Sequence, residues 1–157
     1  GGVPTISLAR TLILKRQRRR PFARFGLLRE RAIRAEAHRL VATWDITPPD
    51  IDLPLDRFSG GNIQKALLAR ELALDPMLLI ANKPTHGLDA RTAVLVWRAM
   101  RAIAARGGGV LVLTTELDEA LAHADRVGIL RDGRVSPLTS VARAHRLELA
   151  RMMVGGW

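Results

Sequence analysis

The stretch Phe58–Asp89 reads FSGGNIQKALLARELALDPMLLIANKPTHGLD, and its character changes along its length. It opens on a glycine turn, continues in residues that are almost all good helix formers, and reaches a stop at Asp75-Pro76. An apolar run at Met77–Ala81 follows and ends in polar residues. We therefore expect a helix over Ile63–Leu74, then a short buried strand, then a loop that leads into another helix.

The residues after this stretch continue the alternation of helix and strand. Helical spacing predicts a helix over Ala90–Arg106, with Val94, Trp97 and Met100 on its core face. Apolar runs and turn residues predict a strand at Val110–Thr114, a helix at Leu117–Ala124, a strand at Arg126–Arg131, a hairpin turn at Asp132-Gly133 and a final helix at Pro137–Val154. This alternation is typical of an α/β fold with a parallel sheet, in which ligands bind at the carboxyl ends of the strands.

The residues before this stretch show helical patterns without strand-like apolar runs. A mixed apolar pattern over Val3–Leu14 suggests a short helix, and Leu28–Trp44 has helical spacing with charges between its apolar residues. The chain therefore divides, by prediction, into a helical subdomain at 1–57 and an α/β part at 58–157. Between the two helices, Lys15–Arg20 reads KRQRRR, which is either a solvated stretch or a contact for phosphates or lipid headgroups.

Composition excludes several classes of protein. The chain has 157 residues, 48% of them hydrophobic, and no apolar run approaches the roughly 18 residues of a membrane span. It opens without the apolar core of a signal peptide, and it has no cysteine for disulfides or thiolate metal sites. The four histidines show no metal-ligand spacing with carboxylates, so we expect no protein metal site. These features fit a cytoplasmic protein.

The net charge of +10 suggests a nucleic acid or an anionic membrane as partner. All but three of the 25 basic residues are arginines, a bias that base composition of the gene also produces. Aromatic residues, which stack on bases, make up only 4% of the chain. We therefore expect no nucleic-acid partner, and nucleic-acid binding is kept as an alternative.

Ser59-Gly60-Gly61-Asn62 opens the first predicted helix. Two glycines allow close backbone approach, and a helix N-terminus offers unpaired N–H groups and partial positive charge, so the segment suits a phosphate. The alternative is a serine N-cap after a glycine turn.

The motifs SGGNIQK, LARELALDP, PTHGLD, ELDEALAHADR and VGILRDGRV occur in this order. Their order resembles the C-terminal part of ATP-binding cassette (ABC) transporter ATPases, and above all the second cassette of the tandem ATPases that drive bacterial nucleoside and simple-sugar importers. The resemblance implies a partial P-loop NTPase-like core with an N-terminal helical subdomain. It also implies a peripheral location on the cytoplasmic face of the membrane, with a second cassette and transmembrane permease subunits as partners.

The resemblance assigns roles by position. The nucleotide-binding signature, which reaches the γ-phosphate of ATP held by the opposite cassette, corresponds to Phe58, Ser59, Gly60, Gly61, Asn62 and Gln64. The loop that links the two sites of a dimer corresponds to Gly87, Leu88 and Asp89. ATP and Mg²⁺ would sit at this composite site, held mostly by the partner cassette.

Three positions depart from the family pattern. Asn82 stands where the family has an aspartate that organises Mg²⁺, Lys83 where it has the glutamate that polarises water, and Thr115 where many members have a histidine. An amide is a weaker Mg²⁺ ligand than a carboxylate, and a protonated lysine cannot accept a proton from water. We expect a site that cannot hydrolyse ATP, which leaves open whether the chain acts as an enzyme.

The chain also contains no Gly-Lys dipeptide, so it lacks the G-x-x-x-x-G-K-[ST] phosphate loop. We expect this loop to lie in a portion upstream of Gly1. The alternative reading is a remnant that binds a partner ATPase but no nucleotide.

Overall fold

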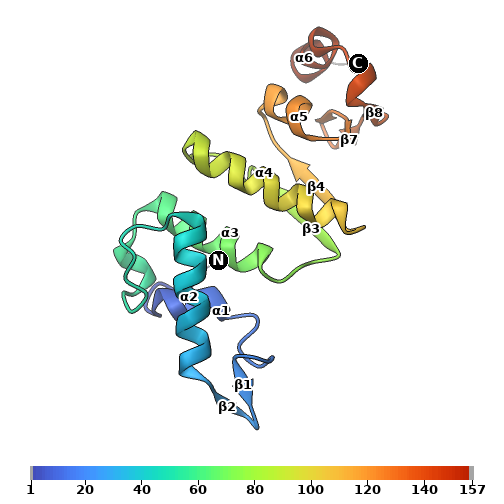
Figure 1. The fold of residues 1–157 in the computed structure, drawn as a ribbon. Helices are drawn as coiled ribbons and strands as arrows, with labels where there is room; N and C mark the ends of the chain where they lie inside the picture. Colours follow the sequence, from blue (N-terminus) through green and yellow to red (C-terminus); the bar gives the residue numbers. More distant parts are fainter. Residues whose placement is uncertain (1, 156–157) are drawn as a thin grey trace. The chain divides into compact units, whose positions relative to one another are not determined.

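The computed structural model describes residues 2–155, which form two units (Figure 1). The first unit extends to Leu111 and the second begins at Val112, so strand β4 (Gly109–Leu113) runs across the boundary. Each unit has its own buried cluster. The predicted boundary between residues 57 and 58 stays a prediction.

The helices α1 (Leu8–Ile13), α2 (Glu30–Trp44) and α3 (Gly60–Leu72) pack against one another in the first unit (Figure 1). The buried side chains of α2 follow the predicted helical spacing, whereas on α3 the buried face is narrower than predicted. The buried residues of the three helices include Leu8, Leu12, Ile33, Ala37, Leu40, Trp44, Ala66 and Ala69. Helix α1 is shorter than the predicted Val3–Leu14 because the segment before Ser7 forms turns. A short 3₁₀ helix, η1 (Leu55–Arg57), precedes α3.

Arg70 lies on the buried face of α3, where it interrupts the apolar pattern. Its guanidinium pairs with the carboxylate of Glu71 at 2.7 Å, and Lys15 pairs with the same carboxylate at 2.6 Å. A buried charge is tolerated because it is paired in this way.

A small hairpin formed by β1 (Ala23–Arg24) and β2 (Leu27–Leu28) lies between α1 and α2 in the sequence. Figure 1 shows it beyond the N-terminal end of α2. Sequence reasoning did not predict it, because two-residue strands leave no periodicity to detect.

The strand–helix–strand unit predicted after α3 is present as β3 (Leu78–Asn82), α4 (Ala90–Ala105) and β4. The two strands are neighbours in one sheet, and Gly109 N donates to Met77 O at 2.8 Å. The prediction that the strands are buried is wrong, because Leu78, Ile80 and Leu111 are exposed and the other residues of the two strands are at most half-buried. On α4, Trp97 and Met100 are buried as predicted, whereas Val94 is exposed.

The second unit contains α5 (Leu117–His123), β5 (Arg126–Val127), β6 (Leu130–Arg131), β7 (Arg134–Val135), β8 (Thr139–Ser140), η2 (Val141–Arg143) and α6 (Arg146–Gly155). The predicted turn at Asp132-Gly133 is confirmed, since both residues have positive φ and join the antiparallel strands β6 and β7. The strand predicted at Arg126–Arg131 is two short strands, and each pairs antiparallel with a later strand. The helix predicted at Pro137–Val154 begins only at Arg146, because Thr139 and Ser140 pair with β5.

Candidate functional site

The segment Phe58–Asn62 follows η1 and includes the start of α3, and one of its five residues is buried. Phe58 is buried and anchors the segment in the helical core. Ser59 has extended backbone and caps α3, because its Oγ accepts a hydrogen bond from Asn62 N at 3.5 Å. The N-cap alternative considered for Ser59 is therefore part of the local structure. Among residues 2–155 it leaves the backbone N–H groups of Gly60 and Gly61 without a hydrogen-bond partner.

The side chain of Asn62 holds the start of α3 in place. Its Nδ2 donates to Ser59 Oγ at 3.0 Å, and its Oδ1 accepts from Thr47 N, in the loop after α2, at 2.9 Å. This carboxamide is thus engaged on both sides within the protein. Contact with a ligand at this point falls to the backbone and to the Ser59 hydroxyl.

Gly60 and Gly61 form the first turn of α3, and both have ordinary negative φ. A Cβ built on either residue would meet no heavy atom within 4 Å. Neither the backbone conformation nor the packing of the described residues therefore requires glycine here. Alanine would favour the helix more, so the two glycines cost stability and leave open space beside the helix N-terminus.

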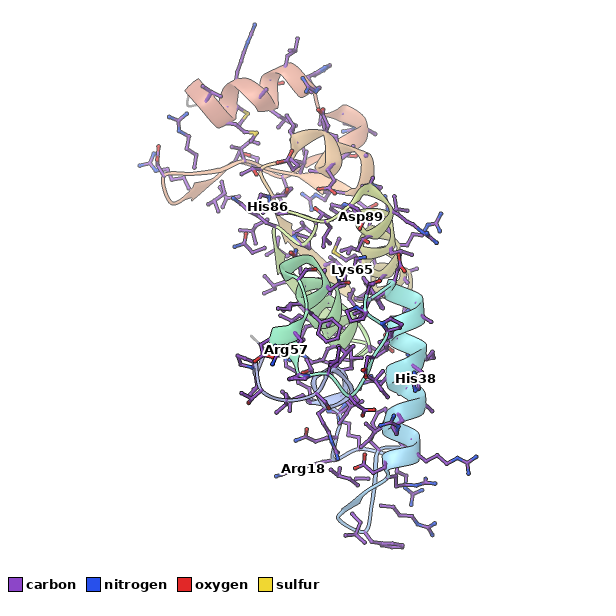
Figure 2. All side chains as sticks on the ribbon, turned by 90° about the vertical axis from the view of Figure 1, so that its left-hand side faces the viewer. Arg18, His38, Arg57, Lys65, His86 and Asp89 are labelled. Atoms are coloured by element: carbon purple, nitrogen blue, oxygen red, sulfur yellow. The ribbon has the colours of Figure 1, made fainter. Side chains whose placement is uncertain are left out.

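Two side chains connect α3 to the segment after β3. Gln64 Nε2 donates to the carbonyl of Pro84 at 3.3 Å. Lys65 Nζ donates to the carbonyl of Asp45 at 3.0 Å and lies 3.6 Å from Oδ2 of Asp89. Figure 2 shows Lys65 on α3 and Asp89 at the start of α4 near one another. The role of Lys65 was not predicted, because its partners are distant in the sequence.

Asp89 is the N-cap of α4, and its carboxylate is held by Thr92. It accepts hydrogen bonds from Thr92 Oγ1 at 2.7 Å and from Thr92 N at 2.9 Å. These bonds, and less strongly the nearby Lys65 ammonium, lower the pKa of Asp89 to about 2. The carboxylate is therefore ionised throughout the physiological range.

The loop between β3 and α4 contains the other predicted site residues. Gly87 has a φ of +75°, which glycine adopts readily, and Leu88 N donates to Thr85 O at 3.1 Å. Leu88 is half-buried, whereas Gly87 and Asp89 are exposed. This loop is thus preorganised by its own turns and by the cap at Asp89.

Asn82 and Lys83 are exposed at the end of β3, as the sequence predicts for a strand that ends in polar groups. Lys83 has a φ of +47°, a left-handed conformation that is unfavourable for a long side chain. Among the described residues, neither side chain has a hydrogen-bond or ion-pair partner. Both groups are therefore free to face solvent or a ligand.

Thr115 belongs to the second unit, just after β4. It is exposed, and its hydroxyl donates to Glu116 Oε1 at 3.5 Å. The neighbouring Thr114 Oγ1 accepts from Glu116 N at 3.0 Å. The pair of threonines thus forms a polar end to β4.

Among residues 2–155, no helix has the length and apolar character needed to cross a bilayer. Nor does this part of the chain bring together three acidic, histidine or cysteine side chains in an arrangement that would hold a metal ion.

No family model matches the chain, but curated relatives do. It is 32% identical over 156 residues to the nucleoside import ATP-binding protein NupA of Lactococcus lactis, which covers 99% of this chain and 31% of that protein. It is 37% identical over 111 residues to the ribose import ATP-binding protein RbsA 2 of Rhizobium meliloti, covering 71% and 22%. The guanosine import ATP-binding protein NupO of Bacillus subtilis is 30% identical over 155 residues, covering 99% and 30%. The chain spans less than a third of each of these relatives.

Solved structures of ABC cassettes have the same fold. The ATP-binding subunit of an ABC transporter matches with a TM-score of 0.75 at 22% identity, over 96% of this chain and 63% of that one. A dimeric bacterial ABC transporter cassette matches with a TM-score of 0.73 at 22% identity, over 90% and 59%. The chain therefore has part of the P-loop NTPase fold of ABC ATPase cassettes. Its homologues are ribose and nucleoside import ATP-binding proteins, as the sequence resemblance predicted.

Proposed function

We propose that this chain is the C-terminal cassette portion of an ABC importer ATPase for nucleosides or simple sugars. In this role it lends its signature loop to an ATP molecule held by a second cassette. One observation carries the proposal. Gly60 and Gly61 leave the N-terminus of α3 open to a ligand although nothing in the described fold requires glycine at either position. Phosphate oxygens suit that site because they accept from unpaired backbone N–H groups.

The signature loop would act by positioning. The first-turn N–H groups and the Ser59 hydroxyl would bind phosphate oxygens, while Asn62 keeps the loop in register with the segment after α2. Gln64 and Lys65 would couple this loop to the Asp89 segment, which we assign to contacts between the two sites of the dimer. Positioning and charge stabilisation are what phosphoryl transfer chiefly asks of a protein.

This chain's own strand end is proposed to be incapable of hydrolysis. At the end of β3, Mg²⁺ does not fit the residues present, because Asn82 offers an amide and Lys83 a cation. Thr115, after β4, offers a hydroxyl where many family members have a histidine. The carboxylate of Asp89 is already engaged by Thr92 and Lys65. The metal and the residues that cradle ATP would come mostly from the partner cassette.

The remaining partners follow from the importer assignment. A transmembrane permease would hold the complex at the cytoplasmic face of the membrane. This expectation rests on the homologues of this chain, which are named as import ATP-binding proteins. The alternative, a remnant that binds a partner ATPase but no nucleotide, predicts that the glycines are dispensable. Nucleic-acid binding is the second alternative, and it predicts a DNA mobility shift with a steep salt dependence.

The test compares two glycine substitutions in the full gene product that contains this chain. Gly61→Ala should lower the turnover number for ATP at least about tenfold, because the methyl group occupies the space that we assign to the phosphate. Gly155→Ala is the matched control, since Gly155 also lies in a helix with no atom within 4 Å of an added Cβ. Neither change should lower the melting temperature.

Unchanged turnover in Gly61→Ala would refute the role of the signature loop and favour the interaction remnant. Sequencing the gene upstream of Gly1 addresses the same choice independently. An encoded P-loop, preceded by another complete cassette, is expected from the tandem-importer assignment. An in-frame start immediately before Gly1 would contradict it.

A further inference from the structure

The β1–β2 hairpin presents apolar side chains to solvent at its tip. Phe25 is 88% exposed and Leu27 75% exposed, and Leu28 beside them is exposed as well. Large apolar side chains exposed together on so small an element indicate a surface that becomes covered by something else.

The turn itself does not explain Phe25. Phe25 and Gly26 have φ values of +53° and +79°, the left-handed conformations of a type I′ hairpin turn. Asparagine or glycine suits the first of these positions, whereas phenylalanine is strained there. An aromatic residue held in strained backbone and pointing into water suggests a function outside the fold.

Positive charge surrounds this tip. Seven basic residues and no acidic residue occur over Lys15–Arg29. Lys15 pairs with Glu71 at 2.6 Å and Arg16 with Glu36 at 2.9 Å. The other five are exposed and have no carboxylate partner among residues 2–155, and they are Arg18, Arg19, Arg20, Arg24 and Arg29.

The charged and apolar groups share one surface. Arg18 and Arg24 line the same shallow hollow of about 270 Å³ as Phe25 and Leu28, and the Arg24 guanidinium lies 5.0 Å from the centre of the Phe25 ring. Figure 2 shows Arg18 beside the hairpin. Apolar groups flanked by unpaired arginines complement a surface that is anionic outside and apolar just beneath.

We propose that the hairpin binds the surface of an anionic lipid bilayer, a contact separate from the nucleotide role and from any permease. Phe25, Leu27 and Leu28 enter the headgroup boundary, while the five arginines lie against lipid phosphates. Lipid fits better than nucleic acid, because two of the three apolar side chains are aliphatic and cannot stack on bases. An anionic bilayer also complements both the exposed apolar side chains and the arginines, because it is anionic at its surface and apolar beneath it.

The test is co-sedimentation of the chain with vesicles of phosphatidylcholine alone and of phosphatidylcholine mixed with phosphatidylglycerol. Binding should require phosphatidylglycerol and should weaken as salt is added, because salt screens the arginine charges. Binding to both vesicle types alike would overturn the proposal.

Phe25→Asn removes the apolar tip without risk to the hairpin, since asparagine suits the left-handed position. We expect about tenfold weaker vesicle binding. The matched control is Leu147→Asn, another highly exposed apolar side chain, in the second unit, which should bind as the unmodified chain does.

The triple change Arg18→Gln, Arg19→Gln and Arg20→Gln should weaken binding about a hundredfold. Its control removes three charges elsewhere, at Arg134, Arg143 and Arg151, all of them exposed. Equal loss in both triple variants would mean that net charge alone governs binding, and it would overturn the assignment to the hairpin. A third result is that the unmodified chain binds immobilised polyglutamate but no vesicles, and that the triple variant at Arg18, Arg19 and Arg20 loses this binding. That result would overturn the lipid proposal and identify an acidic protein segment as the partner.

Discussion

At the scale of single residues, Asp89 is the most strongly perturbed group of the candidate site. Its folded pKa of about 2 lies below the ordinary 3.8 because Thr92 donates two hydrogen bonds to the ionised form. A depressed pKa means that folding favours the carboxylate. Asp89 therefore stabilises the first unit above pH 4 or so, and this contribution is lost as the pH falls towards 2.

Asp89→Asn should consequently flatten the loss of stability between about pH 4 and pH 2. Near neutral pH the same variant should be less stable, because its neutral amide is a weaker partner for Lys65 and for the helix N-terminus. Urea unfolding followed across this pH range measures both effects. Asp56→Asn is the control for general acid sensitivity, because Asp56 is an exposed carboxylate of the same unit and has no ion-pair partner among residues 2–155. Parallel pH curves for unmodified protein and Asp89→Asn would contradict the assignment.

The structural role of Ser59 could be predicted from the sequence, whereas the structural contacts of Asn62 and Lys65 could not. The local pattern around Ser59 was sufficient, because an N-cap and its helix are only a few residues apart. The roles of Asn62 and Lys65 depend on Thr47 and Asp45, which approach only when α2 packs beside α3. No local pattern encodes such contacts, so a sequence motif alone assigns Asn62 to a ligand and misses its structural bonds.

At the scale of elements, strand β3 also shows that a local sequence pattern does not reveal contacts with distant residues. The apolar run predicted a strand correctly, but a run of apolar residues does not reveal whether one or both faces are covered. In the structure, alternate residues of β3 are exposed. The helix predicted at Pro137–Val154 failed for a related reason, since the pairing of β8 with β5 is decided by residues more than ten positions away.

The end of β3 offers a prediction that separates strain from chemistry. Lys83→Asn should raise the free energy of unfolding of the first unit by up to about 1 kcal/mol, because asparagine tolerates the left-handed conformation better than lysine. In the full gene product it should leave the turnover number for ATP within about twofold, since a protonated lysine takes no proton from water in any case.

Urea unfolding and a steady-state ATPase assay measure the two effects on one variant. Gly61→Ala, assayed beside it, shows what interference with the proposed phosphate contact does to turnover. A tenfold or greater fall in Lys83→Asn, at unchanged stability, would assign Lys83 a part in nucleotide binding that the proposed degenerate site does not include.

At the scale of the whole molecule, the order of motifs predicted the cassette fold. The division after Leu111 was not among the predictions, and the predicted boundary between residues 57 and 58 stays a prediction. The boundary after Leu111 lies inside β4, where composition does not change and no linker appears. The first unit has three mutually packed helices. The second has a cluster of three buried apolar residues, Val127, Ile129 and Leu149, covered partly by Leu117, Leu121, Val141, Ala144 and Met152.

A core this small gives a unit of low stability, because a short chain buries a small share of its surface. Leu149→Ala should cost the second unit about 2–5 kcal/mol, enough to unfold it while the helices of the first unit remain folded. Hydrogen exchange followed by mass spectrometry resolves the two. Peptides that cover β5, β6 and α6 should lose protection, whereas those from α1, α2 and α3 should keep theirs.

Leu147→Ala, at an exposed position of the same helix as Leu149, is the control and should leave both sets of peptides unchanged. If Leu149→Ala removed protection from the peptides of both units, the two units would unfold as one cooperative body. The stability of each unit would then depend on both buried clusters.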